Sequence, residues 1–316
     1  MILIPIALFI LVATLSVAYV TYRLTFYNKN KLDFDPYHSL NKNPPPPFAE
    51  VSRELMNELV AAPFESITIT ARDGKALFGR YYHTKDGAPL DIMFHGYKSG
   101  ALHDFPGGFK EAVALGHNVL LVDQRGHGRS HGRTISFGIK ERFDCLDWVN
   151  YAVEHFGADT KITLVGISMG AATVICAAEL DLPSAVRGII ADCPCSSAEL
   201  IIKKVSGEMG FPPNLVFPFI RLGGRIFGGF DICERTPLLA AENAKLPLLL
   251  IHGDGDGFVP CDMSRDIAER YAGDLTFEVF PDATHGTSYL FDTERYRRIL
   301  KEFYQKTLGE QNDETR

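Results

Sequence analysis

One serine in this sequence lies in a context that favours nucleophilic chemistry. Ser168 is the centre of a Gly-Ile-Ser-Met-Gly motif, between an apolar β-branched run at residues 161–165 and an alanine-rich run at residues 171–178. The first run predicts a buried strand and the second a buried helix. In this strand–turn–helix context the motif forms a sharp turn that exposes the serine hydroxyl above a sheet. We therefore interpret Ser168 as a nucleophile that attacks an acyl carbonyl; the alternative is a plain helix cap.

The base that activates this serine is expected further along the chain. A serine hydroxyl is a weak nucleophile unless a base accepts its proton and a carboxylate orients that base. Where the motif forms such a turn, an acid and then a histidine follow the serine in the sequence. His285 is the one histidine beyond the acidic candidates, in a Phe-Pro-Asp-Ala-Thr-His-Gly loop before the last predicted helix. We assign His285 as the base; the alternative is a surface loop histidine.

Three aspartates are candidates for the orienting acid. Asp256 lies between two glycines after the apolar run at residues 247–251, so its loop can bend and bring the carboxylate to the imidazole Nδ1 of His285. We assign Asp256, with Asp254 as the second candidate and Asp192 as the third. A calcium loop is the competing interpretation, but an Asp-x-Asp pair alone lacks the further oxygen ligands. The sequence therefore predicts no metal site.

Backbone N–H groups near the serine must stabilise the charge that develops on the carbonyl oxygen. The Phe-His-Gly-Tyr-Lys-Ser-Gly segment at residues 94–100 follows an early central strand. We expect the N–H of Tyr97 and the N–H of Met169 to form this oxyanion hole. His95 is interpreted as a structural turn residue.

Strand-like and helix-like segments alternate from about residue 50 onward. Eight strands are predicted, at residues 66–71, 76–83, 90–94, 118–123, 161–165, 187–191, 247–251 and 275–280. Predicted helices include residues 137–155, 264–271 and 293–307. A hairpin followed by strand–helix alternation predicts an α/β fold, with a mostly parallel eight-stranded sheet covered by helices on both faces.

The connection between the strands at residues 187–191 and 247–251 is longer than a plain crossover requires. It combines an apolar Phe- and Pro-rich segment with two Gly-Gly pairs. We interpret residues 196–243 as a helical lid insertion over a pocket. The alternative is an additional structural helix pair.

The amino terminus has the character of a membrane segment. Residues 1–22 contain no charged side chain and would span roughly 33 Å as a helix, which is enough to cross a bilayer. We predict a transmembrane anchor at residues 1–24 that is not cleaved; a cleaved signal peptide is the alternative. Because Arg23, Lys29 and Lys31 follow the span, the positive-inside rule places the body of the protein in the cytoplasm.

The rest of the chain divides into three further parts. Residues 25–49 form a spacer whose Asn-Pro-Pro-Pro-Pro-Phe run predicts a stiff polyproline II rod. Residues 50–310 form one catalytic domain, and residues 311–316 form a polar tail. The net charge of −7 and the lack of a basic stripe argue against a nucleic-acid partner. The six cysteines are expected to be buried free thiols.

Five motifs, in their order along the chain, resemble the signatures of the α/β-hydrolase superfamily. They are His95-Gly96, the Asp-Gln-Arg-Gly-His-Gly-Arg-Ser run at residues 123–130, the Ser168 motif, Gly253-x-x-Asp256-x-x-Val259-Pro260 and His285-Gly286. The similarity covers about residues 60–308. In detail the chain looks like bacterial membrane-anchored hydrolases related to prolyl-oligopeptidase-like and serine-aminopeptidase-like members.

This resemblance implies a nucleophile at Ser168, an acid at Asp256, a base at His285 and no cofactor. It also implies an extracellular catalytic domain, because some relatives of this kind are cell-surface enzymes; the basic residues after the anchor indicate the opposite face.

The expected function is that of a serine hydrolase that cleaves a carboxylic ester, thioester or amide through an acyl-enzyme. An esterase or lipase-like activity is favoured because the insertion offers apolar walls and no charged clamp for a peptide terminus. The alternatives are a serine peptidase of the aminopeptidase or prolyl-oligopeptidase-like type, and a non-catalytic membrane-tethered binding protein on the same fold. The expected partners are a small-molecule acyl substrate and, through the amino-terminal helix, a membrane.

Overall fold

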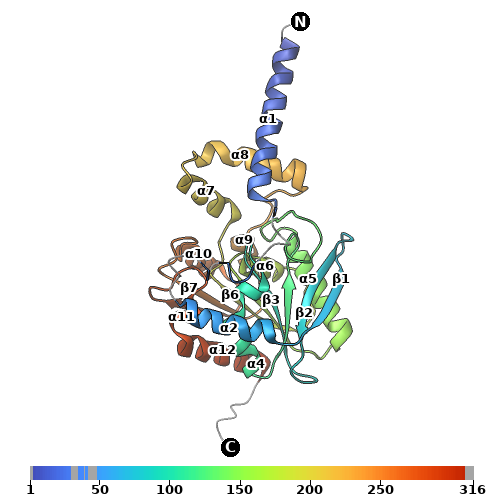
Figure 1. Ribbon diagram of the computed structural model, residues 1–316, viewed down its shortest axis with the longest axis vertical. Helices are drawn as coiled ribbons and strands as arrows, with labels where there is room; N and C mark the ends of the chain where they lie inside the picture. Colours follow the sequence, from blue (N-terminus) through green and yellow to red (C-terminus); the bar gives the residue numbers. More distant parts are fainter. Residues whose placement is uncertain (1–2, 30–34, 39, 42–47, 310–316) are drawn as a thin grey trace, which may run out of the picture.

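The structure is a computed structural model that describes residues 3–29, 35–38, 40–41 and 48–309. The proline run of the predicted spacer and the predicted polar tail lie outside these residues. Figure 1 shows the long helix α1 (Leu3–Thr25) projecting from the body of the protein, with helices α7 (Ala198–Glu208) and α8 (Pro213–Gly223) at its base.

The apolar β-branched runs form one eight-stranded sheet with the strand order β1-β2-β4-β3-β5-β6-β7-β8. Strand β2 is antiparallel to both of its neighbours, β1 and β4, and every other neighbouring pair is parallel. The strands are β1 Glu65–Thr70, β2 Ala76–Tyr82, β3 Leu90–Phe94, β4 Asn118–Asp123, β5 Ile162–Ile167, β6 Val186–Asp192, β7 Leu248–Gly253 and β8 Leu275–Phe280. The predicted fold class is therefore confirmed.

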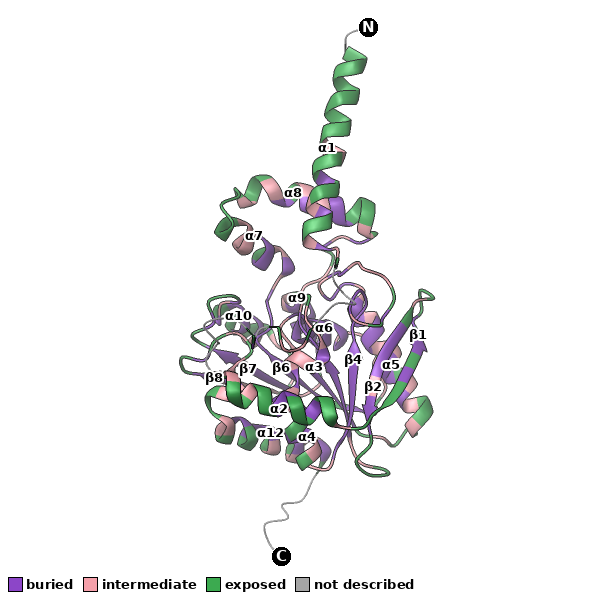
Figure 2. Ribbon diagram, viewed as in Figure 1, coloured by how far each residue is buried: buried purple, intermediate pink, exposed green. Residues whose placement is uncertain are grey.

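Helices cover both faces of this sheet, and each face has its own apolar core. On one face Trp148 of α5 and the alanines of α6 pack against the strands, together with α9 and α10. On the other face Phe109 of α4 and Phe303 of α12 do so, together with α2. Central strands such as β4 are buried along their whole length, as Figure 2 shows. This two-sided burial explains why their sequences read as continuous apolar runs.

The remaining helices have the following bounds. They are α2 Ala49–Ala61, α3 Ala101–Asp104, α4 Pro106–Ala114, α5 Glu141–Phe156, α6 Met169–Ala177, the π-helix η1 Gly224–Gly228, α9 Pro237–Ala241, α10 Asp262–Arg270, α11 Ser288–Phe291 and α12 Thr293–Leu308.

Helix α5 begins four residues later than the sequence predicts, at Glu141 instead of residue 137. Phe137 and Gly138 have φ angles of 54° and 95°, which a right-handed helix cannot accommodate. The Glu141 carboxylate accepts hydrogen bonds from the N–H groups of Ser136 and Gly138, at 2.8 and 2.9 Å. These bonds stabilise a turn in place of the expected first helical turn.

The predicted insertion at residues 196–243 contains α7, α8, η1 and α9. Helix α8 crosses α1 so closely that a Cβ atom on Gly223 would lie 2.3 Å from the carbonyl oxygen of Ala18. Helix α7 packs elsewhere, above the loop that carries Asp256: Lys204 Nζ donates to the Gly257 carbonyl oxygen at 2.7 Å. The insertion thus connects the amino-terminal helix with the loops at the carboxyl edge of the sheet.

Candidate active site

The turn between β5 and α6 places Ser168 at the carboxyl edge of the sheet. Ser168 has φ 55° and ψ −116°, a backbone conformation that L-residues rarely adopt. Close approach of strand and helix forces this turn: a Cβ atom on Gly170 would lie 1.7 Å from the Phe94 carbonyl oxygen, and one on Gly166 would lie 2.4 Å from Gly170. The two glycines of the motif are therefore required by packing.

The structure brings the three sequence-predicted side chains together. Ser168 Oγ lies 2.9 Å from His285 Nε2, and His285 Nδ1 lies 2.7 Å from Asp256 Oδ2. Ser168 follows β5, Asp256 follows β7 and His285 follows β8, so three parallel strands deliver the groups to one edge. Such a chain of contacts allows the imidazole to accept the serine proton while the carboxylate holds its orientation.

Asp256 is held as a carboxylate by its surroundings. Its Oδ1 accepts the N–H groups of Phe258 and Val259, both at 2.9 Å, and His252 Nε2 lies 3.3 Å from its Oδ2. Burial alone would raise the pKa of Asp256, but hydrogen bonds from His252 and His285 outweigh burial and hold it well below the ordinary value. The group next to the imidazole is therefore ionised.

The other two acid candidates do not contact His285. Asp254 is exposed and accepts the N–H of Asp282 at 2.6 Å. Asp192 is buried and accepts the hydroxyl of Tyr296 at 3.1 Å, while its second oxygen has no hydrogen-bond partner among the described residues. Burial raises the pKa of Asp192 to about 6.

The loop after β3 lies directly beside Ser168. A Cβ atom on Gly96 would lie 3.4 Å from Ser168 Cβ. The Gly96 N–H donates to Asp104 Oδ2 at 2.6 Å, so it is not available to a substrate. The N–H of Met169 is the first of helix α6 and has no intrahelical acceptor. His95 is fully buried and its Nε2 accepts the Gln124 N–H at 3.1 Å, in agreement with a structural turn residue.

Asp104 and Cys193 are two neighbours of the site that the sequence reasoning missed. Asp104 binds the Ser99 hydroxyl at 2.6 Å as well as the Gly96 N–H, and so fixes the loop that carries Tyr97. Its position soon after the His-Gly motif was the only available signal, because the contact depends on how helix α3 folds back.

Cys193 follows β6 with φ 47°, and its Sγ lies 4.0 Å from His285 Nε2. Burial raises the pKa of this thiol well above its ordinary value, so it is neutral. Cys193, Asp256 and His285 place one potential metal-ligand atom each within 4.8 Å of one another. However, the Asp256 oxygens already accept the bonds described above, and metal binding at His285 Nε2 would displace Ser168. The arrangement fits proton transfer better than metal binding.

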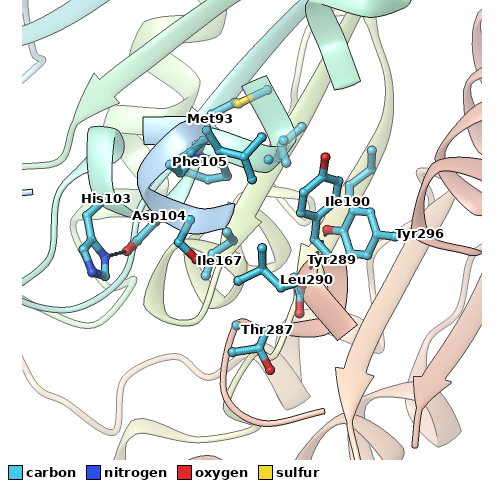
Figure 3. Close-up of a pocket in the computed structure, with 18 of the residues that line it drawn as sticks. Met93, His103, Asp104, Phe105, Ile167, Ile190, Thr287, Tyr289, Leu290 and Tyr296 are labelled. Atoms are coloured by element: carbon cyan, nitrogen blue, oxygen red, sulfur yellow. Dashed lines mark hydrogen bonds and ion pairs between the residues drawn. The ribbon is translucent and has the colours of Figure 1, made fainter. Parts of the chain in front are cut away.

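A cavity of about 260 Å³ lies beside His285 and extends between the sheet and helices α2 and α12. Figure 3 shows its inner wall, with Ile167 and Ile190 from β5 and β6 and Leu290 from α11. Leu55 and Met56 of α2 close another side. The lining residues in the described part of the chain include none from residues 196–243.

Helix α2 lines this cavity, whereas its described lining includes no residue of the insertion, and the expected lid over the site stays a prediction. One face of α8 packs against α1 instead. Phe217 and Ile220 of α8 share one apolar cluster with Tyr22 of α1 and with Phe26, which follows α1.

Comparison with known proteins agrees with this architecture. The family described as the alpha/beta hydrolase fold matches residues 92–216. The structure of the Pyrococcus furiosus esterase Pf2001 superimposes with a TM-score of 0.64 at 23% identity, over 80% of this chain and 96% of that chain. The chain has the α/β-hydrolase fold. The chain also has relatives that are found by sequence similarity.

Two such relatives show how far the sequence similarity extends. Protein YqkD of Bacillus subtilis is 29% identical over 202 residues, which cover 64% of this chain and 65% of that protein. The chain thus spans just under two thirds of the length of this relative. The lysophosphatidylserine lipase ABHD12 of Macaca fascicularis is 23% identical, over 64% of this chain and 52% of the lipase.

One helix among the described residues, α1, is long and apolar enough to cross a membrane by length and composition. Its side chains are almost all exposed along the amino-terminal two thirds, as the green ribbon in Figure 2 shows. A membrane anchor and a signal sequence both have this character.

Proposed function

We propose that this protein is a membrane-anchored serine hydrolase that cleaves a carboxylic ester through an acyl-enzyme. The observation that carries the proposal is the continuous contact from Ser168 Oγ through the imidazole of His285 to Asp256, at 2.9 and 2.7 Å. The sharp backbone turn at Ser168, with its positive φ, is a second, independent support because such strain persists only where surrounding structure imposes it.

In the proposed reaction, Ser168 Oγ attacks the ester carbonyl carbon while its proton passes to His285 Nε2. The N–H groups of Tyr97 and Met169 then stabilise the tetrahedral oxyanion. The imidazolium gives the proton to the departing alkoxide, which leaves as an alcohol. Water next attacks the acyl-serine, with His285 as base, and the carboxylic acid and free Ser168 are released. Asp256 stabilises the imidazolium in both halves of the cycle.

The cavity beside His285 is the proposed site for the acyl chain. Most of its wall is apolar, including Ile167, Ile190 and Leu290 together with two residues of α2. Apolar walls favour a hydrocarbon chain over a charged peptide terminus. The ester specificity and the membrane insertion of α1 are parts of the same proposal.

The nucleophile is tested by labelling the full-length protein with a fluorophosphonate probe. We expect the wild type to be labelled and Ser168→Ala to be unlabelled, since the phosphonate forms its bond with the activated hydroxyl. Thr284→Ala is a matched control, because Thr284 is an exposed hydroxyl residue next to His285 in the sequence. Equal labelling of the wild type and Ser168→Ala would refute the assignment.

The substrate class is tested with p-nitrophenyl esters of increasing acyl length and with aminoacyl amides. We expect ester turnover, and we expect Leu290→Trp to lower kcat/KM for long acyl chains by about 10-fold while acetate turnover is retained, because the indole would fill the cavity. Leu239→Trp, at an exposed position on α9, is the control. Preference for aminoacyl amides would indicate a peptidase, and a flat response to both series would indicate a binding protein.

A further inference from the structure

Helix α1 projects from the body of the protein and crosses helix α8 of the insertion. Ala18 and Tyr22 are the buried residues of α1, and both lie against Gly223, where α8 crosses. Figure 1 shows α8 running across the base of α1. From this crossing towards the amino terminus, α1 has almost no contact with protein.

The free part of α1 is too short to cross a bilayer by itself. From Leu3 to Val17 an α-helix rises about 22 Å, whereas the hydrocarbon core of a bilayer is about 30 Å thick. The apolar character of α1 continues through Val20 and Leu24, which are exposed beside α8. If the whole apolar length of α1 is to lie within the membrane, the crossing helix α8 must lie at the membrane boundary.

Near the crossing of α1 and α8, the surface of the insertion is apolar and carries few charges, as a position at the membrane boundary requires. Residues 209–230 contain no acidic residue, and their only charged residues are Arg221 and Arg225. Both arginines pair with Asp231, so their charge is partly compensated on the protein side. Large apolar side chains are nevertheless exposed here, at 38–65% of their full surface: Met209, Phe211, Leu215, Ile226 and Phe227.

Aromatic rings mark the same level on α1. The ring of Tyr19, which is 44% exposed, packs edge-on against Phe227 at 5.1 Å between centroids. Arg23 lies over the ring of Tyr27 at 3.8 Å. Tyrosine and arginine at the end of an apolar span are typical of the membrane–water interface.

We propose that α8 and η1 dock into the headgroup–acyl boundary of the bilayer that α1 enters. This inference rests on the proposed membrane insertion of α1 and is independent of the catalytic residues. The face of α8 that carries Phe217 and Ile220 packs within the protein. The exposed apolar side chains of α8, η1 and the α7–α8 connection are the part of the insertion that enters this boundary, as in amphipathic helices that lie in the membrane plane. The occupant of the exposed apolar surface at residues 209–227 is therefore lipid.

Docking would fix the height of the active site above the membrane. Two residues of the loop after β3 bind the last carbonyl groups of α1: the Tyr97 hydroxyl donates to Thr25 O at 2.6 Å, and Lys98 Nζ donates to Leu24 O at 3.0 Å. The parallel strands also point their carboxyl ends towards α1 (Figure 1). The catalytic edge therefore faces the lipid surface, which suits an ester substrate held in that leaflet.

Tryptophan fluorescence in vesicles of brominated phosphatidylcholine tests the docking. The chain has a single tryptophan, Trp148, which is 1% exposed in the core and provides a constant background. The full-length variants Leu215→Trp and Ile226→Trp add a probe to the proposed docking surface. We expect most of the added fluorescence to be lost when bromine is attached near the headgroup end of the acyl chains.

The control is Phe64→Trp, at an exposed aromatic position before β1. Residue 64 directly precedes β1, whose first residue Glu65 pairs with Tyr81. The neighbouring Tyr82 pairs with Val119 near the start of β4. Because the other end of β4 points towards α1 (Figure 1), this position lies at the end of the strands that is farther from α1. We expect its fluorescence to be unchanged by bromine.

Flotation of the same vesicles distinguishes the two possible failures. If the protein floats with the vesicles but Leu215→Trp and Ile226→Trp behave like Phe64→Trp, the docking is refuted and the anchor remains. If the wild type does not float, the proposed membrane insertion of α1 fails, and the docking fails with it.

Discussion

The carboxyl edge of the sheet, which carries Ser168, and the region where α1 meets the insertion are held together by different forces. At the carboxyl edge, serial hydrogen bonds join Ser168, His285 and Asp256, and backbone atoms of neighbouring segments touch at Gly166 and Gly170. Around α1, apolar and aromatic side chains such as those of Tyr22, Phe26 and Phe230 form one cluster, beside the two hydrogen bonds to the end of α1. A chain of hydrogen bonds is directional, whereas apolar packing is not.

This difference predicts different responses to mutation. A hydrogen-bonded chain fails when one atom is replaced, because the remaining groups lose their orientation. Apolar packing loses stability gradually, in proportion to the buried surface removed or the overlap introduced. Substitutions in the first region should therefore abolish activity or folding, whereas substitutions around α1 should change stability and leave the chemistry intact.

The largest expected effect on activity comes from the acid. Asp256→Asn should lower kcat by about 10⁴-fold with the fold retained, because the amide cannot hold the required imidazole tautomer or stabilise its charge. Asp254→Asn, at the exposed aspartate two residues earlier, should remain within about 2-fold of the wild type by the same reasoning. Steady-state turnover of a p-nitrophenyl ester measures both variants. If kcat fell equally in both variants, the loss would reflect a disturbed loop and would contradict a specific role of the Asp256 carboxylate.

The largest expected effect on folding comes from Gly170, in the sharp turn that carries Ser168. Gly170→Ala should destabilise the protein by more than about 4 kcal/mol, because its Cβ would lie 1.7 Å from the Phe94 carbonyl oxygen in the centre of the sheet. Gly108→Ala is the control: its nearest neighbour, a Phe105 carbon, would be 3.5 Å away. Urea denaturation in detergent compares the two. A soluble, stable Gly170→Ala protein would contradict the close packing.

A third prediction concerns the pH dependence contributed by Asp192. Its pKa is about 6 in the folded protein and 3.8 in its ordinary state, so the folded state binds more protons between these pH values. The stability contributed by this carboxyl therefore falls as the pH rises through that window. Asp192→Asn should gain about 3 kcal/mol in unfolding free energy relative to the wild type between pH 4 and pH 8. Parallel pH profiles for the two proteins would contradict this.

The smallest expected effect belongs to the crossing of α1 and α8. Gly223→Val should cost about 1–3 kcal/mol through overlap with Ala18 and Tyr22, while the rate of fluorophosphonate labelling stays near the wild-type rate. Gly207→Ala, whose Cβ would meet Pro213 at an ordinary 3.4 Å, is the control in the same insertion. Loss of labelling in Gly223→Val would show that the two regions are coupled more tightly than their contacts indicate.

Much of the framework could be predicted from the sequence because its signals are local. Each predicted strand overlaps an observed one, since a run of β-branched residues buried on both faces has few other solutions. The position of Ser168 in its turn followed from two glycines within five residues. The choice of Asp256 over Asp254 rested on the flexibility of one loop. Of these two aspartates, only Asp256 forms a hydrogen bond with His285 in the structure.

The helix that lines the cavity could not be predicted in this way. We predicted a cover from residues 196–243 and predicted no helix at residues 49–61, although both segments contain amphipathic helices in the structure. In the structure the insertion packs against α1 and α2 lines the cavity. The contacts of the whole molecule decide which two apolar faces pack together. The spacing of apolar residues along the chain identifies such a face but not its partner.

The sequence by itself therefore determined the strands, the sharp turn at Ser168 and the residue types available for proton transfer, because periodicity and close backbone packing act over a few residues. Tertiary structure alone decided three other features: the approach of Cys193 to His285, the burial of Asp192 beside Tyr296, and the bonds from Tyr97 and Lys98 to the end of α1. These contacts join segments that are far apart in the chain. Their geometry exists only once the sheet has aligned its strand ends.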